Sequence, residues 1–272
     1  MKRTYTPWIV LLLLWSVVPL VWQVYTSFCT PDAITKPFEM AENRWTLQNY
    51  IQVLTSNPPF WRYLLNSTIL GFFSTALTLI LAVPAAYTLS RIPKGLERLL
   101  KILLIGTALF PYVLLFLSLL QVARNMNLGN NLIALSIPYA ALSMPLAILL
   151  LSAAFQDLPE NLEEAARLEG LDLWQRMRWI LIPLIAPATA STAILVFLFS
   201  WNEFPIALTW ISRSDLLTLP VAMARIAGSS VYSVPYGAYA AATVLGAIPL
   251  LIIVLLFQKQ IISGLTQGAI KG

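Results

Sequence analysis

Six long stretches of this chain carry no charged side chain, and they constrain its fold more than any other feature. Each stretch is longer than the roughly 20 apolar residues that a helix needs to cross about 30 Å of hydrocarbon. The stretches without Asp, Glu, Lys or Arg are 4–31, 63–90, 102–123, 125–156, 179–202 and 226–258. We therefore predict an all-α integral membrane protein, a single domain over 1–272 with transmembrane helices at approximately 8–28, 66–90, 102–122, 133–154, 184–203 and 238–259.

The composition agrees with a membrane protein and disfavours several other classes. Hydrophobic residues make up 58% of the chain and charged residues 11%, whereas soluble domains carry about 25% charged residues. The chain has no His, which removes the commonest general base and metal ligand. Cys29 is the only cysteine, so no disulfide can form within the chain. We predict no catalytic residue, no metal site and no nucleic-acid partner, since the net charge of +5 is modest and scattered.

The N-terminus resembles a signal peptide at first sight, because Lys2 and Arg3 precede an apolar run. The run over 8–28 is longer than a signal core of about 7–15 residues, and no A-x-A cleavage site follows it. We therefore predict that this segment is retained as the first transmembrane helix.

The distribution of Lys and Arg predicts the orientation, because cytoplasmic segments of membrane proteins carry the excess of both. With the N-terminus inside, the inner segments hold eleven of the seventeen basic residues and the outer segments six, although the outer loops are longer. The inner ones are Lys2, Arg3, Arg91, Lys94, Arg98, Lys101, Arg167, Arg176, Arg178, Lys259 and Lys271, and the outer ones are Lys36, Arg44, Arg62, Arg124, Arg213 and Arg225. We predict a multi-pass protein with both termini in the cytoplasm.

The loop over 157–183, between the fourth and fifth spans, is acidic and helix-forming. Asp157 and Glu160 are spaced as a capping box for a first helix, with Pro159 in its first turn. We predict that this helix ends at Gly170 in a left-handed conformation. Asp172 and Gln175 are spaced as the cap of a second helix, which leads into the fifth span.

Six of the twelve acidic residues lie in this loop: Asp157, Glu160, Glu163, Glu164, Glu169 and Asp172. Two interpretations stay open from the residues alone. The loop is either a solvated connector between two spans or a rigid docking element for a cytoplasmic partner.

A resemblance to a known family bears on this choice. Glu164-Ala165-Ala166, then Gly170, then Ile180-Leu181-Ile182-Pro183 matches the signature E-A-A, three residues, G, nine residues, I-x-L-P of permease subunits of bacterial ATP-binding-cassette (ABC) importers. The one departure is Ile182 in place of leucine, a volume-conserving change. The segments 201–204 (WNEF), 264–272 (GLTQGAIKG) and the pair Asn66-Ser67 resemble the smaller, six-span permease of maltose-type carbohydrate importers.

The resemblance implies partners and a location. Such a permease lies in the bacterial cytoplasmic (inner) membrane, pairs with a second, homologous permease, and binds two copies of an ATPase subunit. An extracytoplasmic solute-binding protein delivers the sugar. ATP and Mg²⁺ belong to the ATPase, and this chain has no G-x-x-x-x-G-K-[ST] phosphate loop, so we expect it to bind no cofactor of its own.

The resemblance also implies site residues. The ATPase-docking residues would be Glu164, Ala165, Ala166, Arg167, Gly170 and Arg176. Glu164 would accept a charge-assisted hydrogen bond, the alanines would pack on the ATPase, and Gly170 would set the turn. For Arg167 and Arg176 we favour solvated side chains over pairing with the ATPase. The tail over 264–272 is flexible by composition, with a regulatory contact and a frayed end both open.

Candidate residues for the translocation path or an outer gate are Tyr112, Asn125, Tyr139, Asn202 and Glu203. Sugar sites combine aromatic faces with a few polar groups, but the spacing singles out none of these residues. A carboxylate at the end of a span is costly unless it is exposed or paired. Glu203 is therefore either at an outer gate or at a solvated helix end, and we favour the second.

The expected cargo is a disaccharide or glucoside of the trehalose, maltodextrin or glucosylglycerol class. A permease for glycerol phosphates or another small solute is the alternative. An ion-coupled secondary transporter would need carboxylates or histidines within the membrane, which the six uncharged stretches lack, and a membrane scaffold would not explain the fixed spacing of the loop.

Overall fold

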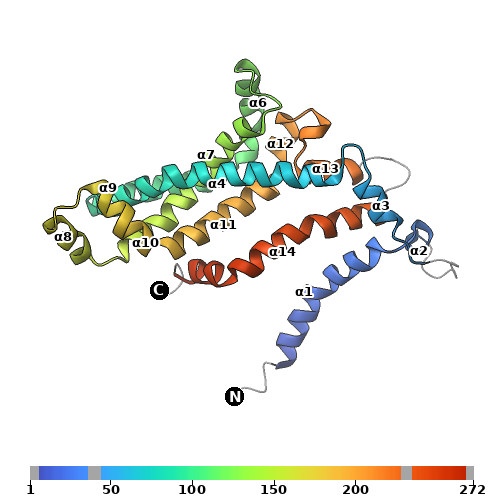
Figure 1. The fold of residues 1–272 in the computed structure, drawn as a ribbon, viewed down its shortest axis with the longest axis horizontal. Helices are drawn as coiled ribbons and strands as arrows, with labels where there is room; N and C mark the ends of the chain where they lie inside the picture. Colours follow the sequence, from blue (N-terminus) through green and yellow to red (C-terminus); the bar gives the residue numbers. More distant parts are fainter. Residues whose placement is uncertain (1–5, 36–43, 228–234, 268–272) are drawn as a thin grey trace.

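The computed structural model describes residues 6–35, 44–227 and 235–267, and these residues form helices joined by short connections (Figure 1). Among them the one extended pairing is an isolated antiparallel bridge between Cys29 and Trp45. The all-α class predicted from the sequence is confirmed.

Three helices are long and apolar enough to cross a membrane by themselves. They are α4 (Phe60–Arg91), α7 (Leu132–Gln156) and α14 (Tyr236–Gln267), and they coincide with the predicted second, fourth and sixth spans. Helix α1 (Thr6–Ser27) coincides with the predicted first span and is apolar over Leu11–Ser27.

The predicted third and fifth spans are bent helix pairs rather than single rods. In the third, α5 (Lys94–Ala108) meets the η1 turn (Tyr112–Leu115) and α6 (Phe116–Asn125) at 74°. The break contains Pro111, which has no N–H to donate to a helix and disfavours helical geometry in the residue before it. The predicted range 102–122 therefore extends across the break into both limbs of this pair.

In the fifth span, residues Leu173–Leu184 form one limb, and α11 (Ala186–Asn202) forms the other at 77° to it. The first limb comprises α9 (Leu173–Arg176), a π-helical turn η2 (Met177–Leu181) and α10 (Ile182–Leu184). The buried side chain of Ile185 lies at the corner.

The connection between α1 and α4 and the connection between α11 and α14 contain short helices. These are α2 (Pro31–Thr35) and α3 (Gln48–Leu54) before α4, and α12 (Pro205–Trp210), the η3 turn (Ser214–Leu216) and α13 (Leu219–Ala227) after α11.

The core is built on α4, which packs along α7 and is crossed by α11. The crossing is close at Gly71, where an added Cβ would lie 2.7 Å from the ring of Phe197. One apolar cluster, which includes Ala82, Leu151 and Leu181, fills the half of the bundle nearer α8 (Glu160–Leu168). A larger cluster around Tyr139 and Trp201 fills the other half.

The two ends of the bundle differ. Helix α3 contacts the start of α14, and the buried amide of Asn49 donates to the carbonyl oxygens of Ser27 and Cys29, so the end of α1 meets the start of α14 here. Helix α8 lies at the opposite end of the long axis (Figure 1). The start of α1 and the end of α14 therefore both point away from the α3 end.

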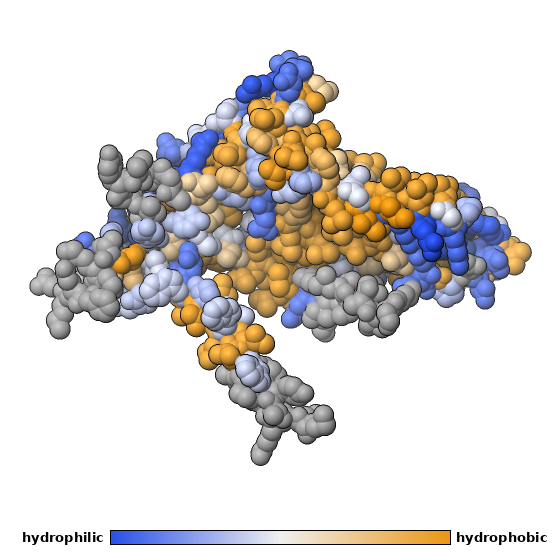
Figure 2. All heavy atoms as spheres, turned by 180° about the vertical axis from the view of Figure 1, so that it is seen from behind, coloured by the Kyte–Doolittle hydropathy of each residue, from blue (hydrophilic) through white to orange (hydrophobic). Residues whose placement is uncertain are grey.

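The surface between the ends is hydrophobic (Figure 2). Helix α1 exposes Trp15 by 81% and Leu20 by 66%, and α14 exposes Leu255 by 65%. Exposing so much apolar side-chain surface to water would be energetically unfavourable. These side chains therefore fit the lipid-facing surface that the composition predicts.

Candidate functional site

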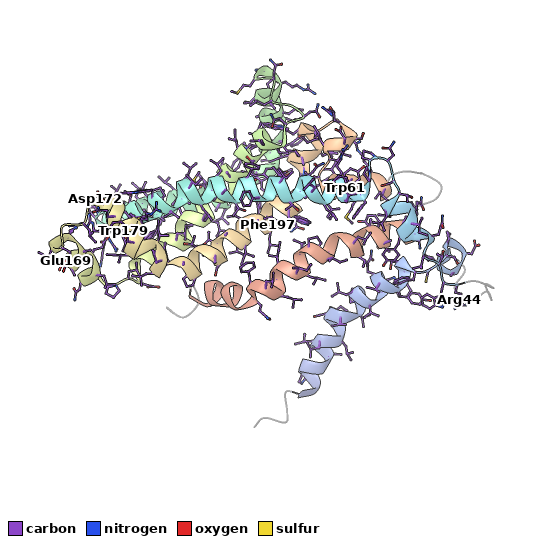
Figure 3. The ribbon with its side chains drawn as sticks, in the orientation of Figure 1. Arg44, Trp61, Glu169, Asp172, Trp179 and Phe197 are labelled. Atoms are coloured by element: carbon purple, nitrogen blue, oxygen red, sulfur yellow. The ribbon has the colours of Figure 1, made fainter. Side chains whose placement is uncertain are left out.

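The loop over 157–183, which we call the coupling loop after the ATPase-docking role that the resemblance implies, forms the tip of the molecule at the α8 end. Figure 3 shows Glu169 and Asp172 at this tip, and Trp61 and Arg44 toward the other end. The loop consists of α8, a turn at Gly170 and the limb that begins with α9.

Helix α8 begins differently from the prediction. Its N-cap is Pro159, and Asp157 instead ends α7, where its N–H donates to the carbonyl oxygen of Ala153 at 3.1 Å. Pro159, and not the predicted Asp157, is therefore the N-cap of α8. Because α7 continues to Gln156, Asp157 is the C-cap of that helix. The side chain of Glu160, the other member of the predicted capping box, lies outside the described residues.

The turn at Gly170 is as predicted. Gly170 has φ +80°, and its N–H donates to the carbonyl oxygen of Arg167 at 3.0 Å. The N–H of Leu171 donates to the carbonyl oxygen of Ala166 at 3.1 Å, which completes a Schellman motif. A glycine adopts this left-handed conformation without the penalty that a side chain would bring.

The predicted cap at Asp172 is also confirmed. Its Oδ1 accepts from the N–H of Gln175 at 2.7 Å, and Oε1 of Gln175 accepts from the N–H of Asp172 at 2.9 Å. The turn and the cap together satisfy backbone groups on both sides of the corner at Gly170. These hydrogen bonds restrain the angle between α8 and α9, and we call this restrained corner a stiff elbow.

The exposed surface of α8 is mixed. Glu164, Ala165 and Arg167 are exposed. Leu168 is 90% exposed, although it is a large apolar residue. Ala166 is 4% exposed and packs within the chain, so its side chain does not lie on the outer face with Ala165.

An ion pair that the sequence did not predict holds α8 against the membrane helices. Nε of Arg91, the last residue of α4, lies 2.9 Å from Oε2 of Glu163, whose side chain is 9% exposed. Arg91 also donates from Nη1 to the carbonyl oxygen of Phe155 at 3.4 Å, and its guanidinium lies 5.7 Å from the ring centroid of Tyr87. Arg91 thus joins the ends of α4 and α7 to α8.

Arg176 is 8% exposed, whereas the sequence favoured a solvated side chain. Its Nε donates to the carbonyl oxygen of Asp172 at 3.4 Å. The expectation of solvation was wrong because α9 turns this side of the helix toward the bundle. Arg167 is exposed, as expected.

Glu203 is buried rather than solvated, with 3% exposure. Its Oε1 accepts from the N–H of Ile206 at 2.9 Å and its Oε2 from the N–H of Ala207 at 3.1 Å. The hydroxyl of the buried Tyr139 donates to the same Oε2. The preferred interpretation of a solvated helix end was wrong, since the chain turns into α12 directly after Glu203 and offers its free N–H groups to the carboxylate.

The other path candidates lie in different surroundings. Tyr112 and Tyr139 both contact Phe199, at 5.8 and 6.4 Å between ring centroids. Asn125 ends α6 with an exposed side chain. Asn202 is exposed and donates to the carbonyl oxygen of Leu198 at 2.8 Å. The structure thus brings the two tyrosines and Glu203 together.

A hollow of about 490 Å³ opens between α11, α13 and α14. It combines aromatic with polar side chains. Among its lining residues are Trp201, Asn202, Phe204, Tyr239 and Thr243.

Asn66 and Ser67 fix the segment that follows α12. The amide of Asn66 donates to the carbonyl oxygens of Asp215 at 3.0 Å and Leu217 at 2.9 Å. The hydroxyl of Ser67 accepts from the N–H of Leu219 at 2.8 Å. These contacts join residues about 150 positions apart in the chain, and only the resemblance had singled out this pair.

The tail departs in part from the expectation of flexibility. Helix α14 continues through Gln267, so Gly264 to Gln267 are helical. Residues 268–272 lie outside the described residues.

Comparisons with known proteins agree with this geometry. A family model described as "Binding-protein-dependent transport system inner membrane component" matches residues 42–267. The chain is 36% identical to the sulfoquinovosyl glycerol transport system permease protein SmoH of Agrobacterium fabrum, over 96% of this chain and 91% of that protein. It is 38% identical to the trehalose/maltose transport system permease protein MalG of Thermococcus litoralis, over 93% and 91%.

A solved structure has the same fold. A chain from the crystal structure of a bacterial ABC transporter involved in the import of alginate superposes with a TM-score of 0.77 at 22% identity, covering 95% of this chain and 98% of that one.

Proposed function

This chain belongs to the family of binding-protein-dependent transport system inner membrane components, and we propose that it is a permease subunit of an ATP-driven sugar importer. It lies in the bacterial cytoplasmic membrane with both termini inside. It forms half of the path for a disaccharide or glucoside, beside a second, homologous permease. The observation that carries the proposal is the coupling loop, a stiff elbow at one tip of a membrane bundle.

The exposed face of α8 is the docking site for an ATPase subunit. Glu164 and Arg167 offer one charge of each sign, and Leu168 offers a large apolar side chain that is 90% exposed. An apolar side chain between charged neighbours fits the buried centre of a protein interface. ATP and Mg²⁺ bind to the ATPase, and an extracytoplasmic solute-binding protein delivers the sugar.

Two connections carry movement of the docked α8 into the membrane. The first is the ion pair between Glu163 and Arg91, which ends α4. The second is the limb over Leu173–Leu184, which meets α11 at 77°. Both lead to helices that pack in the core, α4 and α11, so closure of the ATPase pair is transmitted to these two helices.

The hollow beside α11 is this subunit's contribution to the sugar path. Trp201, Phe204 and Tyr239 supply aromatic faces, and Asn202 and Thr243 supply groups that pair with hydroxyls. The trehalose and maltose named for one relative and the trehalose named for another support a glucoside as cargo. The alternative cargo is a glycerol phosphate or another small solute. Tyr112 and Asn125, which do not line this hollow, stay predicted residues of the path.

Cross-linking tests the docking site. Leu168→Cys places a thiol on α8, and Leu47→Cys, 63% exposed near α3, is the matched control. The native Cys29 is 1% exposed and does not compete. In membranes that contain the whole importer, a thiol–amine cross-linker should join position 168 to the ATPase subunit and leave position 47 unjoined. Absence of a cross-link from position 168 would contradict the docking site.

The same variants test the orientation. A membrane-impermeant thiol reagent added to intact cells should label position 47 and reach position 168 only after the membrane is opened. The reverse pattern would overturn both the topology and the coupling.

Transport discriminates between energy sources. Proteoliposomes that hold the complete importer, with its binding protein outside, should accumulate labelled trehalose or maltose only with ATP inside. Uptake driven by an imposed ion gradient without ATP would favour an ion-coupled transporter.

A further inference from the structure

A second hollow, of about 700 Å³, lies at the α8 end of the bundle and has a different character from the sugar path. It is formed where α4 ends, α5 begins and α7 ends. Four cationic side chains line it: Arg91, Lys94, Arg98 and Lys101. Of these four, only Arg91 forms an ion pair with the coupling loop, through Glu163.

Two of the four cations are already neutralised. Arg91 pairs with Glu163 at 2.9 Å, and Lys101 pairs with Glu97 at 2.6 Å. Gln156 completes the second pair, because its Nε2 donates to Glu97 at 2.7 Å and its Oε1 accepts from Lys101 at 3.3 Å. Glu97 therefore has its own partners.

Lys94 and Arg98 form no salt bridge or side-chain hydrogen bond among the residues that the structure describes, although Lys94 is near enough to Glu97 to interact with it electrostatically. Both side chains are exposed, and both lie on the first two turns of α5, four residues apart and so on one face of the helix. The four cations and the two acids that pair with them, Glu163 and Glu97, leave an excess of two positive charges at the hollow. That excess calls for an anionic ligand.

The surface beside the hollow is apolar. Beyond Lys101, α5 exposes Ile102 by 59%, Leu103 by 57% and Ile105 by 47%. Figure 2 shows hydrophilic surface gathered at the α8 end next to a hydrophobic band. A ligand for this place therefore needs an anionic head and an apolar body that extends along α5.

We propose that Lys94 and Arg98 bind the phosphate headgroup of an anionic glycerophospholipid in the leaflet that adjoins the coupling loop. The acyl chains lie along the exposed leucine and isoleucine side chains of α5. Basic pockets between membrane helices bind such headgroups by the same chemistry. A free phosphate ion would use the two cations but would gain nothing from the apolar face. The inference goes beyond the proposed function and requires only that the chain is in a bilayer.

Because the site adjoins Arg91 and Gln156, a bound lipid braces the corner where α4, α5 and α7 meet beneath α8. The leaflet then contributes to the rigidity of the docking end. A membrane with few anionic lipids should leave this corner less restrained.

Native mass spectrometry of the complete, delipidated importer tests the site. Phosphatidylglycerol and phosphatidylcholine with the same acyl chains are titrated in, and the dissociation constant of the first bound lipid is compared. The test variant is Lys94→Gln with Arg98→Gln. The matched control is Arg62→Gln with Arg124→Gln, two exposed cations elsewhere on the chain.

Wild type and control should prefer phosphatidylglycerol, and the test variant should bind it about 25-fold more weakly, since each basic residue near an anionic lipid is worth about fivefold. Millimolar inorganic phosphate should not displace the lipid. The proposal is overturned by equal binding of the two lipids to wild type, by an undiminished preference in the test variant, by an equal loss in the control, or by displacement with phosphate. The readout is lipid binding and does not include sugar uptake. A failure of the lipid proposal can therefore be told apart from a failure of the proposed transport function.

Discussion

Nε of Arg91 lies 2.9 Å from Oε2 of Glu163, although the two residues are 72 positions apart in the chain. The pair links the end of α4 to the second turn of α8. Glu163 is the neighbour of the motif residue Glu164, yet the side chain of Glu163 is buried and that of Glu164 is exposed. Glu163 thus holds α8 to the bundle, and Glu164 takes no part in that contact.

The first prediction concerns this division of roles. Glu163→Ala leaves the guanidinium of Arg91 partly buried without its counterion, and we expect a loss of about 1–3 kcal/mol in stability. Glu164→Ala removes an exposed carboxylate and should change stability by less than about 0.5 kcal/mol. Thermal unfolding of the detergent-solubilised importer measures both. Equal effects of the two substitutions would show that Glu163 does not hold α8.

The second prediction concerns the corner. Gly170→Ala should cost about 1–2 kcal/mol, because a side chain at φ +80° is strained although no atom lies within 4 Å of the added Cβ. Gly95→Ala is the matched control, since Gly95 also has open space around its Cβ but lies within helix α5. That control should be neutral or stabilising by about 0.5–1 kcal/mol.

Both glycine variants are compared by thermal unfolding and by ATPase activity stimulated by the sugar-loaded binding protein. Only Gly170→Ala should lower the stimulated activity. A stimulated rate equal to wild type in that variant would contradict the need for a stiff corner.

The third prediction concerns the segment over 205–227. Asn66→Ala removes the amide that donates to the carbonyl oxygens of Asp215 and Leu217, and unpaired buried carbonyls cost about 1–3 kcal/mol. Limited proteolysis should then cleave the segment over 205–227 faster. Thr68→Ala is the control, because its hydroxyl donates only to Leu64 on its own helix. Unchanged cleavage in Asn66→Ala would mean that other contacts hold the segment.

The fourth prediction concerns Glu203. Tyr139→Phe removes one donor and leaves Oε1 and Oε2 with the N–H groups of Ile206 and Ala207. Glu203→Leu removes the acceptor for all three donors. We expect a loss of about 1 kcal/mol for the first variant and a clearly larger one for the second, measured by thermal unfolding. Tyr112→Phe serves as the control for loss of a tyrosine hydroxyl. A Glu203→Leu variant as stable as wild type would restore the interpretation of a free carboxylate.

Local patterns in the sequence predicted the parts of the fold that local physics decides. The uncharged stretches located the membrane helices, and the short-range spacing at Gly170 and at Asp172 predicted a turn and a cap that the structure contains. Asp157 was misassigned because two overlapping signals, the end of α7 and the start of α8, compete for one residue.

Contacts between distant residues were not predictable in this way. Nothing in the spacing indicates that Arg91 pairs with Glu163 or that Asn66 reaches Leu217. Glu203 was expected to be solvated because a carboxylate at a span end usually is. Its burial depends on α12 turning back beside it, which is a tertiary arrangement.

The corner at Ile185 gives the fifth span a mechanical character that a straight rod would lack. Its two limbs stand 77° apart, and the corner residue is 2% exposed and packed in the apolar cluster near α8. In the proposed importer, a force along the shorter limb would therefore be redirected at the packed corner, and α11 would turn about Ile185 instead of sliding along its own axis.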